Sequence, residues 1–252
     1  MNKFIIVFKI ADYSKLMKAA ILAGGFGKRL RPLTDSRPKP LIEIDGVPIV
    51  VLQIEWLKRY GVDEAVLCVG YMREVIQSLL GDGSNFGIRI QYAIEEEPLG
   101  TGGALKNAES MLNDEKSFLV LNGDVITNLD PSLLREKLEN GAWSSMSVVP
   151  LRSPFGIVDI ENDLVKGFLE KPLIQEYSIN AGIYCFSGEI FAKLPDKGSI
   201  ETQTFPALAT EGKLAAVSYP EAAWRSIDSH KDIEDAAKEF GEDIRQIKSR
   251  SL

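Results

Sequence analysis

The chain has 252 residues, of which 45% are hydrophobic and 26% are charged, and its formal net charge is −7. This composition is that of a globular protein and excludes a disordered or fibrous one, and the length allows one large α/β domain or two small ones. The overall negative charge argues against non-specific nucleic-acid binding, which favours broad basic surfaces.

The first sixteen residues differ from the sequence that follows. Residues 2–8 are apolar but too short to span a bilayer, and no small-residue cleavage site comes after them. We therefore interpret residues 1–16 as an N-terminal appendage on which function does not depend. The domain is expected to comprise residues 17–252, without a membrane segment.

Strand and helix signals alternate through the first half of the domain, as in βαβ units around a largely parallel sheet. Strands are expected at residues 19–23, 65–69, 88–94 and 118–121, and helices at residues 48–60, 72–80, 102–112 and 131–139.

Short strands dominate the second half. The expected strands at residues 145–150, 156–160, 165–170 and 181–186 predict hairpins that extend the sheet and wall the cleft. A helix at residues 203–211, a strand at 214–219, an extended segment at 224–228 and a charged amphipathic helix from about 230 to 247 follow. No repeat, low-complexity tract or linker divides the chain, so one domain is expected.

A glycine cluster directly after the first strand is followed by a basic run that contains a single acid. Turn-borne N–H groups and nearby cations are what a polyphosphate requires. A Walker loop is excluded by the spacing, and a Rossmann dinucleotide site, with Glu43 on a ribose, is disfavoured because Lys28-Arg29-Leu30 replace the third glycine. The cluster and the run comprise Gly24, Gly25, Gly27, Lys28, Arg29, Arg31, Arg37 and Lys39.

The run LAGGFGKRLRPLT, followed by RPKPLIEI, resembles the signature of sugar-1-phosphate nucleotidylyltransferases. The motifs EEEPLGTGGAL, LNGD, FGIVDI, LEKP and NAGIY follow in the same order, so that the resemblance covers residues 17 to about 235. Within the family, EEEPLGTGG, SIETQTFP and INAGIY are most similar to mannose-1-phosphate guanylyltransferases. The resemblance implies a Rossmann-like three-layer α/β/α domain with a mixed, mostly parallel central sheet. Many members have a further C-terminal β-helix domain, which this sequence is expected to lack.

The implied reaction is attack by a sugar 1-phosphate on the α-phosphorus of a nucleoside triphosphate, with release of pyrophosphate. The resemblance places Arg29 over the triphosphate, Lys39 at the α-phosphate and Asp124 on Mg²⁺. For Lys28, Arg31 and Arg37, a solvated basic loop is an equally good interpretation. The nucleotide is expected to contact Leu22, Ala23, Gly24, Gly25, Gly27, Lys28, Glu95, Gly100 and Thr101.

Two positions depart from the family pattern. Lys28 stands where threonine or serine is usual, and Ser226 stands where the family's second metal aspartate is expected. If the segment around Ser226 is extended, Asp228 lies on the same face and is predicted to bind the metal instead. The Trp-x-x-Ile-Asp form also resembles glucose-1-phosphate cytidylyltransferases.

The sugar phosphate is expected to contact residues of three separate motifs. Glu170 is suited to accept hydrogen bonds from sugar hydroxyls and Lys171 to contact the phosphate, whereas without the neighbouring motifs they would be only a charged pair at a strand end. The full predicted set is Gly156, Glu170, Lys171, Asn180 and Gly182.

The resemblance aligns Gly100 with the base-contacting glycine of the family and so places Glu95 at the nucleobase, where one carboxylate accepts from both N1–H and N2–H₂ of guanine. A solvated acidic strand end is the alternative interpretation of the run Glu95–Glu97. GTP and mannose 1-phosphate are therefore the expected substrates. Alternatives are a thymidylyl- or cytidylyltransferase acting on glucose 1-phosphate, and a nucleotide-sugar-binding regulator with weak catalysis.

Three further expectations concern the environment of the protein. Cys68 and Cys185 lie in apolar strand-like runs and are expected to be reduced core residues of a cytoplasmic protein. No nucleic acid or membrane is expected as a partner. A homodimer is a possible assembly.

Overall fold

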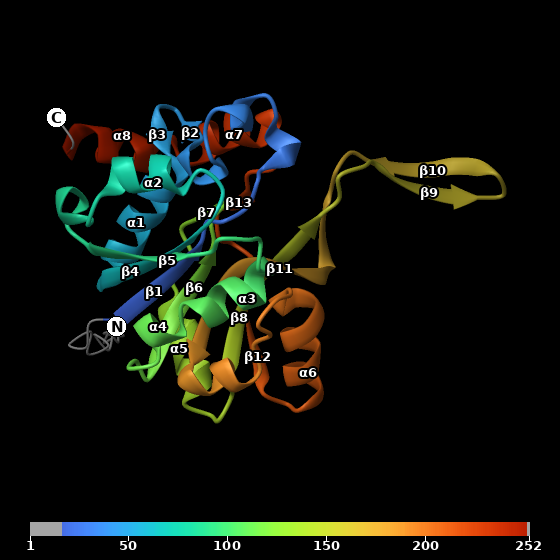
Figure 1. Cartoon of the computed structure of the whole chain (residues 1–252). Helices are drawn as coiled ribbons and strands as arrows, with labels where there is room; N and C mark the ends of the chain where they lie inside the picture. Colours follow the sequence, from blue (N-terminus) through green and yellow to red (C-terminus); the bar gives the residue numbers. More distant parts are fainter. Residues whose placement is uncertain (1–16, 251–252) are drawn as a thin grey trace, which may run out of the picture.

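A computed structural model describes residues 17–250, and the appendage expected at residues 1–16 lies outside the described residues. Its centre is a seven-stranded sheet (Figure 1) in which only β11 runs antiparallel to its neighbours. The predicted mixed, mostly parallel sheet is thereby confirmed. The strand order is β12 (Leu214–Ser218), β8 (Ser144–Arg152), β11 (Leu173–Ser187), β6 (Ser117–Asn122), β1 (Met17–Leu22), β4 (Val62–Val69) and β5 (Arg89–Ile94).

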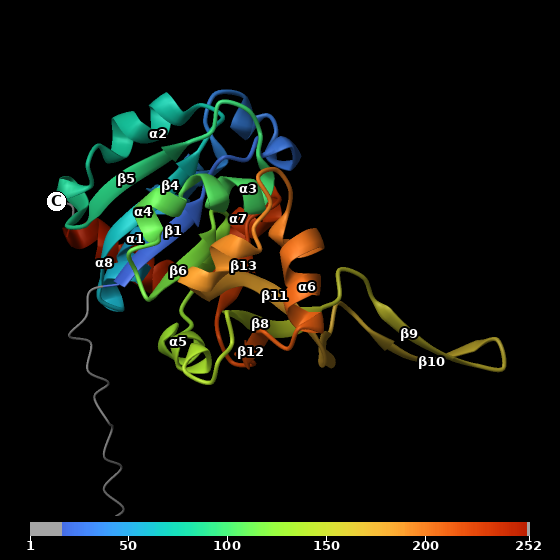
Figure 2. The same ribbon diagram turned by 60° about the horizontal axis from the view of Figure 1, so that its bottom comes forward.

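Both faces of the sheet are buried, because successive strand residues point to opposite sides. In β1, Ala19 and Ile21 belong to one apolar cluster, whereas Ala20 belongs to the other. Helices cover each face (Figure 2), which confirms the three-layer α/β/α arrangement. The first cluster includes residues of α1 (Ile49–Arg59), α2 (Arg73–Leu80), α5 (Ser132–Leu138), α7 (His230–Glu239) and α8 (Gly241–Arg250), and the second those of α3 (Gly100–Asn107), α4 (Glu109–Leu112) and α6 (Phe205–Thr210).

Two predicted helices are each divided in the structure. The helix expected at residues 102–112 becomes α3 and α4, with Ala108 between them. The helix expected at residues 230–247 becomes α7 and α8, because the buried Phe240 ends α7 and Gly241, a poor helix former, begins α8. The helix expected at residues 203–211 is preceded by a π-helical turn at Ile200–Thr204.

The largest departure is an arm, residues 154–172, that projects from the body (Figures 1 and 2). Its strands β9 (Ile157–Glu161) and β10 (Leu164–Leu169) form a separate two-stranded sheet. The prediction that these strands extend the central sheet was therefore wrong, although it was correct for β8 and β11. Pro154 and Pro172 flank the arm and lack the N–H groups that would continue the pairing of β8 with β11.

Two short antiparallel ladders lie beside the central sheet. β7 (Val125–Thr127) pairs with β13 (Trp224–Ser226), and β2 (Glu43–Ile44) pairs with β3 (Val47–Pro48). Glu43 forms an exposed ion pair with Arg37 at 2.7 Å. Among the described residues, no helix combines the length and apolar character needed to cross a membrane.

Both cysteines lie inside the sheet, as predicted. Cys68 and Cys185 are buried and unpaired. Burial raises the pKa of each thiol to about 12, for Cys68 with a contribution from the nearby Glu95 carboxylate. Both thiols are therefore protonated at neutral pH and are not nucleophiles.

Candidate active site

The glycine-rich turn connects β1 to a short 3₁₀ helix at Lys28–Leu30. Gly27 adopts φ 61°, and a Cβ there would lie 2.8 Å from a methyl carbon of Thr34, so only glycine fits. The Thr34 hydroxyl donates to the Gly27 carbonyl at 3.0 Å and closes the loop on itself. The turn therefore has a defined backbone conformation that its own contacts hold.

A pocket of about 280 Å³ lies between this turn, the start of α3 and the end of β6. Nine of the predicted residues line it, and so do six that were not predicted as contacts. The predicted ones are Leu22, Ala23, Gly24, Gly25, Lys39, Glu95, Gly100, Thr101 and Asp124, and the others are Phe26, Pro40, Pro98, Ala104, Asn122 and Gly123.

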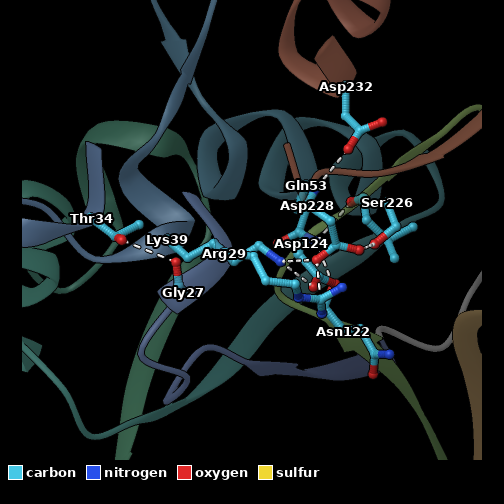
Figure 3. A network of polar contacts seen from close by, with 11 residues as sticks. Gly27, Arg29, Thr34, Lys39, Gln53, Asn122, Asp124, Ser226, Asp228 and Asp232 are labelled. Carbon is cyan, nitrogen blue, oxygen red and sulfur yellow. Dashed lines mark hydrogen bonds and ion pairs between the residues drawn. The ribbon is translucent and has the colours of Figure 1, made fainter. Parts of the chain in front are cut away.

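Lys39 joins the two predicted metal carboxylates at one end of the pocket (Figure 3). Its Nζ donates to Asp124 Oδ2 at 2.6 Å and to Asp228 Oδ1 at 2.9 Å. Arg29 Nη2 lies 3.0 Å from the same Asp228 oxygen, and its side chain is 76% exposed at the mouth of the site. Four predicted residues, Arg29, Lys39, Asp124 and Asp228, therefore form one charged network.

Asp228 is held by contacts from its own segment as well as by the two cations. Ser226 Oγ donates to Asp228 Oδ2 at 3.0 Å, so the two side chains lie together, as the alternation of an extended segment predicts. Burial alone would raise the pKa of Asp228, but the hydrogen bond and charge of Lys39, helped by Ser226 and Arg29, outweigh it and lower the pKa. The carboxylate is therefore ionised at neutral pH.

The predicted metal pair also satisfies the chemistry of a magnesium site. Asp124 and Asp228 direct oxygens at one nitrogen, and their side chains are only 27% and 29% exposed. Mg²⁺ prefers oxygen ligands and commonly takes one or two carboxylates together with substrate phosphates. No cluster of three or more metal-binding side chains occurs among residues 17–250, so two protein carboxylates are what the described residues offer.

Gln53 is a site residue that the sequence prediction missed. It lies on the buried face of α1, is 2% exposed, and donates both Nε2 protons, to the carbonyls of Asn122 and Val125 at 2.9 Å each. These carbonyls flank Gly123 and Asp124, so Gln53 positions the loop that presents the Asp124 carboxylate. Gln53 lies four residues after Ile49 and interrupts an apolar helical stripe with a polar side chain. This interruption was the signal available in the sequence.

Replacing Gln53 by leucine is expected to lower the free energy of unfolding by about 1–3 kcal/mol, because two buried carbonyls lose their donor. Gln53 Oε1 has no hydrogen-bond partner among the described residues, and its removal offsets part of that loss. Urea denaturation measures the change, and Gln246→Leu on the exposed face of α8 is the matched control. Equal stability of both variants would remove Gln53 from this role.

Glu95 lies where a base-contacting residue was predicted, at the edge of the pocket beside the glycine turn. Its Oε2 accepts from the Leu99 N–H at 3.0 Å, and a Cβ on Gly24 would lie 1.9 Å from Oε1. Gly24 is therefore a glycine because the Glu95 carboxylate lies directly against the backbone. The acidic side chain is fixed in the pocket wall rather than solvated at a strand end.

Other predicted residues lie outside the pocket lining. Lys28 Nζ lies 5.6 Å from the centre of the Phe26 ring, and Arg31 forms an exposed ion pair with Asp35. The first part of the predicted sugar set, Gly156, Glu170 and Lys171, lies on the arm.

The second part of the predicted sugar set lies on β11. Asn180 Nδ2 donates to the Tyr184 hydroxyl at 2.8 Å, and its Oδ1 accepts from Gly182 N–H at 2.9 Å. Gly182 in turn lies against the side chain of Asn122, a residue of the pocket. The body of the structure therefore brings Asn180 and Gly182 near the pocket, whereas the arm residues stand apart from it.

A mostly parallel sheet whose first strand ends in a glycine-rich turn, beside a pocket with converging carboxylates and cations, is the architecture of a nucleotide-binding α/β protein. Comparison with known sequences makes this specific. Residues 18–243 match the family described as nucleotidyl transferase. The chain belongs to this nucleotidyl transferase family.

Individual relatives share this similarity over most of the chain. The mannose-1-phosphate guanylyltransferase catalytic subunit beta of Dictyostelium discoideum is 38% identical over 225 residues, which are 86% of this chain and 62% of that protein. The subunit of the same name from Danio rerio is 36% identical over 91% of this chain and 66% of its own length. The chain thus spans slightly less than two thirds of these curated relatives.

A solved structure agrees in fold. HddC from Yersinia pseudotuberculosis is 31% identical, has a TM-score of 0.72, and the match covers 89% of this chain and all of that one. The same protein has also been solved in complex with GMP-PN, and this structure matches with 30% identity and a TM-score of 0.71.

Proposed function

We propose that this chain is a sugar-1-phosphate guanylyltransferase that uses GTP and, as its preferred sugar substrate, mannose 1-phosphate. The observation that supports this best is the convergence of Asp124 and Asp228 on Lys39, next to the glycine-rich turn and a pocket that contains Glu95. The names of the curated relatives and the GMP-PN complex of the HddC structure favour guanine as the base.

The reaction needs alignment of the substrates and neutralisation of their charge more than it needs a general base. A phosphate oxygen of the sugar 1-phosphate forms a bond to the α-phosphorus, the bond from that phosphorus to the α–β bridging oxygen breaks, and its electron pair leaves with pyrophosphate. The nucleophile is already an anion, so the main obstacle is repulsion between two polyanions. Lys39 would neutralise the α-phosphate and Arg29 the leaving pyrophosphate, while N–H groups of the glycine turn bind the triphosphate.

Mg²⁺ is the proposed cofactor, held by Asp124 and Asp228. When bound, it supplies positive charge to the phosphate oxygens. Ser226 orients Asp228 through its hydroxyl, and Gln53 orients Asp124 through the backbone, so each carboxylate has a separate support. Lys28 is proposed to contact the nucleotide as a charge in place of the hydroxyl that is usual in the family.

Glu95 is proposed to select the base. Its carboxylate is fixed by the Leu99 N–H and packs on Gly24, so it presents acceptors toward the pocket without rearrangement. Guanine offers an N1–H and an N2–H₂ side by side, whereas uracil and thymine offer one ring N–H between two carbonyls. The Glu95 carboxylate therefore favours guanine over uracil and thymine.

The decisive experiment measures pyrophosphate release for four nucleoside triphosphates crossed with the 1-phosphates of mannose, glucose and a heptose. GTP with mannose 1-phosphate is expected to give the highest kcat/KM. Turnover with dTTP or CTP and glucose 1-phosphate instead would identify the thymidylyl- or cytidylyltransferase alternative. Tight nucleotide binding without turnover for any pair would show a binding regulator.

The base assignment has its own matched variant in the same assay. Glu95→Gln keeps the shape of the side chain but replaces one acceptor with a donor, and it should lower kcat/KM for GTP by about 10-fold or more, as expected for one lost charge-assisted hydrogen bond. Glu97→Gln is the control, because Glu97 lies outside the pocket lining and pairs with Lys197. Equal effects of the two substitutions would remove Glu95 from base selection.

The remaining partners follow from this activity. Nucleoside triphosphate and sugar 1-phosphate are the proposed ligands, and neither nucleic acid nor membrane is required. Two buried, protonated thiols in a core without disulfides suit a reducing compartment, so we place the reaction in the cytoplasm. A homodimer is the proposed assembly.

A further inference from the structure

The run SIETQTFP, at residues 199–206, is part of the family resemblance but contributes no residue to the lining of the pocket. It begins with the π-helical turn Ile200–Thr204, which Ser199 caps by accepting a hydrogen bond from the Glu201 N–H at 3.2 Å. Such turns are rare and occur frequently at functional sites. We call residues 195–204 the supporting segment, because it lies beside the start of α3 (Figures 1 and 2).

The backbone of the supporting segment caps α3. The Gly198 carbonyl accepts from the N–H groups of Gly102 and Gly103 at 2.9 and 3.3 Å, and the Gly198 N–H donates to the Leu99 carbonyl at 2.8 Å. The first N–H groups of a helix lack intrahelical acceptors, so Gly198 satisfies two of them. A Cβ on Gly100 would lie 2.5 Å from the Gly198 oxygen. The close approach of the supporting segment therefore explains why α3 begins with glycines.

One carboxylate of the supporting segment holds a residue of the pocket wall. Glu201 Oε2 accepts from the hydroxyls of Thr101 at 2.7 Å and Ser199 at 2.6 Å, and the Thr101 hydroxyl accepts from the Ile200 N–H at 3.0 Å. A hydroxyl has one proton to donate, so the Thr101 hydroxyl has none left for a ligand. Thr101 lines the pocket and Glu201 does not. Glu201 therefore fixes the pocket wall from behind.

We infer that Glu201 is a positioning residue for the nucleotide pocket. It holds Thr101, and with it the start of α3, where the nucleotide is bound. A pocket wall that occupies its binding position for only part of the time weakens binding by that fraction, so a wall that is already fixed binds more tightly. The inference rests on the proposed function, because it takes a nucleoside triphosphate as the ligand. It does not depend on which base the nucleotide carries.

The fold itself does not need this carboxylate. The supporting segment is also anchored by Ile200, which is completely buried in the second apolar cluster, and by the backbone hydrogen bonds of Gly198. Removal of the Glu201 side chain is therefore expected to release Thr101 while the segment stays in place. A positioning role and a merely structural role thus differ in what they change, which is nucleotide affinity in the first case and stability in the second.

The test titrates GTP, with magnesium present, into wild-type and variant chains by calorimetry. Glu201→Ala should raise the Kd for GTP about 10-fold, the scale of one hydrogen bond to a charged group. Glu201→Gln should stay within a few-fold, because its amide oxygen still accepts from both hydroxyls. Glu97→Ala is the matched control, since the exposed ion pair of Glu97 with Lys197 joins the same two segments outside the pocket. All three variants should unfold at nearly the wild-type temperature.

A double-mutant cycle separates positioning by Glu201 from direct binding by Thr101. Thr101→Val keeps the shape of the side chain without its hydroxyl, so it should weaken GTP binding about as much as Glu201→Ala. The double variant should be no weaker than either single variant, because both remove the same hydrogen bond. In turnover, Glu201→Ala should raise the KM for GTP and leave kcat and the KM for the sugar 1-phosphate within a few-fold.

Several results would overturn the inference. These are a wild-type Kd in Glu201→Ala, equal losses in Glu201→Ala and Glu201→Gln, or additive losses in the double variant, which would show that the Thr101 hydroxyl binds the nucleotide directly. The wild-type chain is first titrated with four nucleoside triphosphates. Preference for another base would refute only the guanine assignment, and that nucleotide then replaces GTP as the probe. A wild-type chain that binds none of the four would refute the proposed function, and this inference with it, before any variant is compared.

Discussion

Replacing Asp124 by asparagine is expected to lower turnover on the order of 10²–10³-fold, the scale on which loss of one charge-stabilising group acts in an active site. The substitution keeps the shape of the side chain but removes the negative charge that Lys39 contacts at 2.6 Å. One of the two proposed magnesium ligands is thereby converted to a weak, neutral one. Pyrophosphate release at saturating substrates measures the loss.

Folding of the Asp124 variant should be unaffected, since the side chain lies on the pocket rather than in the core. The matched control is Asp35→Asn, which neutralises an exposed carboxylate that pairs with Arg31 in the loop beside the site. Both variants should unfold at nearly the wild-type temperature, and only the first should lose activity. Near-normal turnover of Asp124→Asn would exclude it from the metal site.

Asp228→Asn is expected to reduce turnover about as strongly as the substitution of Asp124, because Asp228 contacts both Lys39 and Arg29. Ser226 only orients this carboxylate, through one hydrogen bond of 3.0 Å, so Ser226→Ala should cost about 10-fold or less. Parallel kinetics of the two variants across a magnesium titration provide the comparison. Asp228→Asn should also raise the magnesium concentration needed for half-maximal rate.

The contrary result is equally clear for this pair. Full activity of Asp228→Asn together with a large loss in Ser226→Ala would place the functional group at Ser226. It would refute the prediction that Asp228 binds the metal in place of an aspartate at position 226. Full activity of both variants would leave Asp124 as the single protein carboxylate of the site.

The nucleotide half of the site could be predicted from the sequence because its residues directly follow the ends of buried strands. The glycine cluster and Lys39 belong to one continuous run after β1, and Asp124 follows β6, the parallel neighbour of β1, at the same edge of the sheet. The carboxyl ends of neighbouring parallel strands lie at the same edge of the sheet. The pattern of strands and turns was therefore enough to predict that these residues come together.

Other features depend on contacts that a local pattern does not specify. Alternation identified β9 and β10 as strands, but alternation does not say with which strand each one pairs, and the arm was misplaced for this reason. Pro154 and Pro172 were the visible signal that pairing stops. Gln53 was missed because its partners are backbone carbonyls 69 and 72 residues away.

The contact between Lys39 and Asp228 spans 189 residues of chain. During synthesis the amino-terminal part of the chain, with the glycine turn, the parallel strands and Asp124, emerges long before this contact is possible. The ammonium of Lys39 has only one of its two carboxylates until residue 228 has left the ribosome and the ladder between β7 and β13 has formed. Nascent or truncated chains that end before residue 228 therefore keep only the contact of Lys39 with Asp124 and lack those of Asp228 with Lys39 and Arg29.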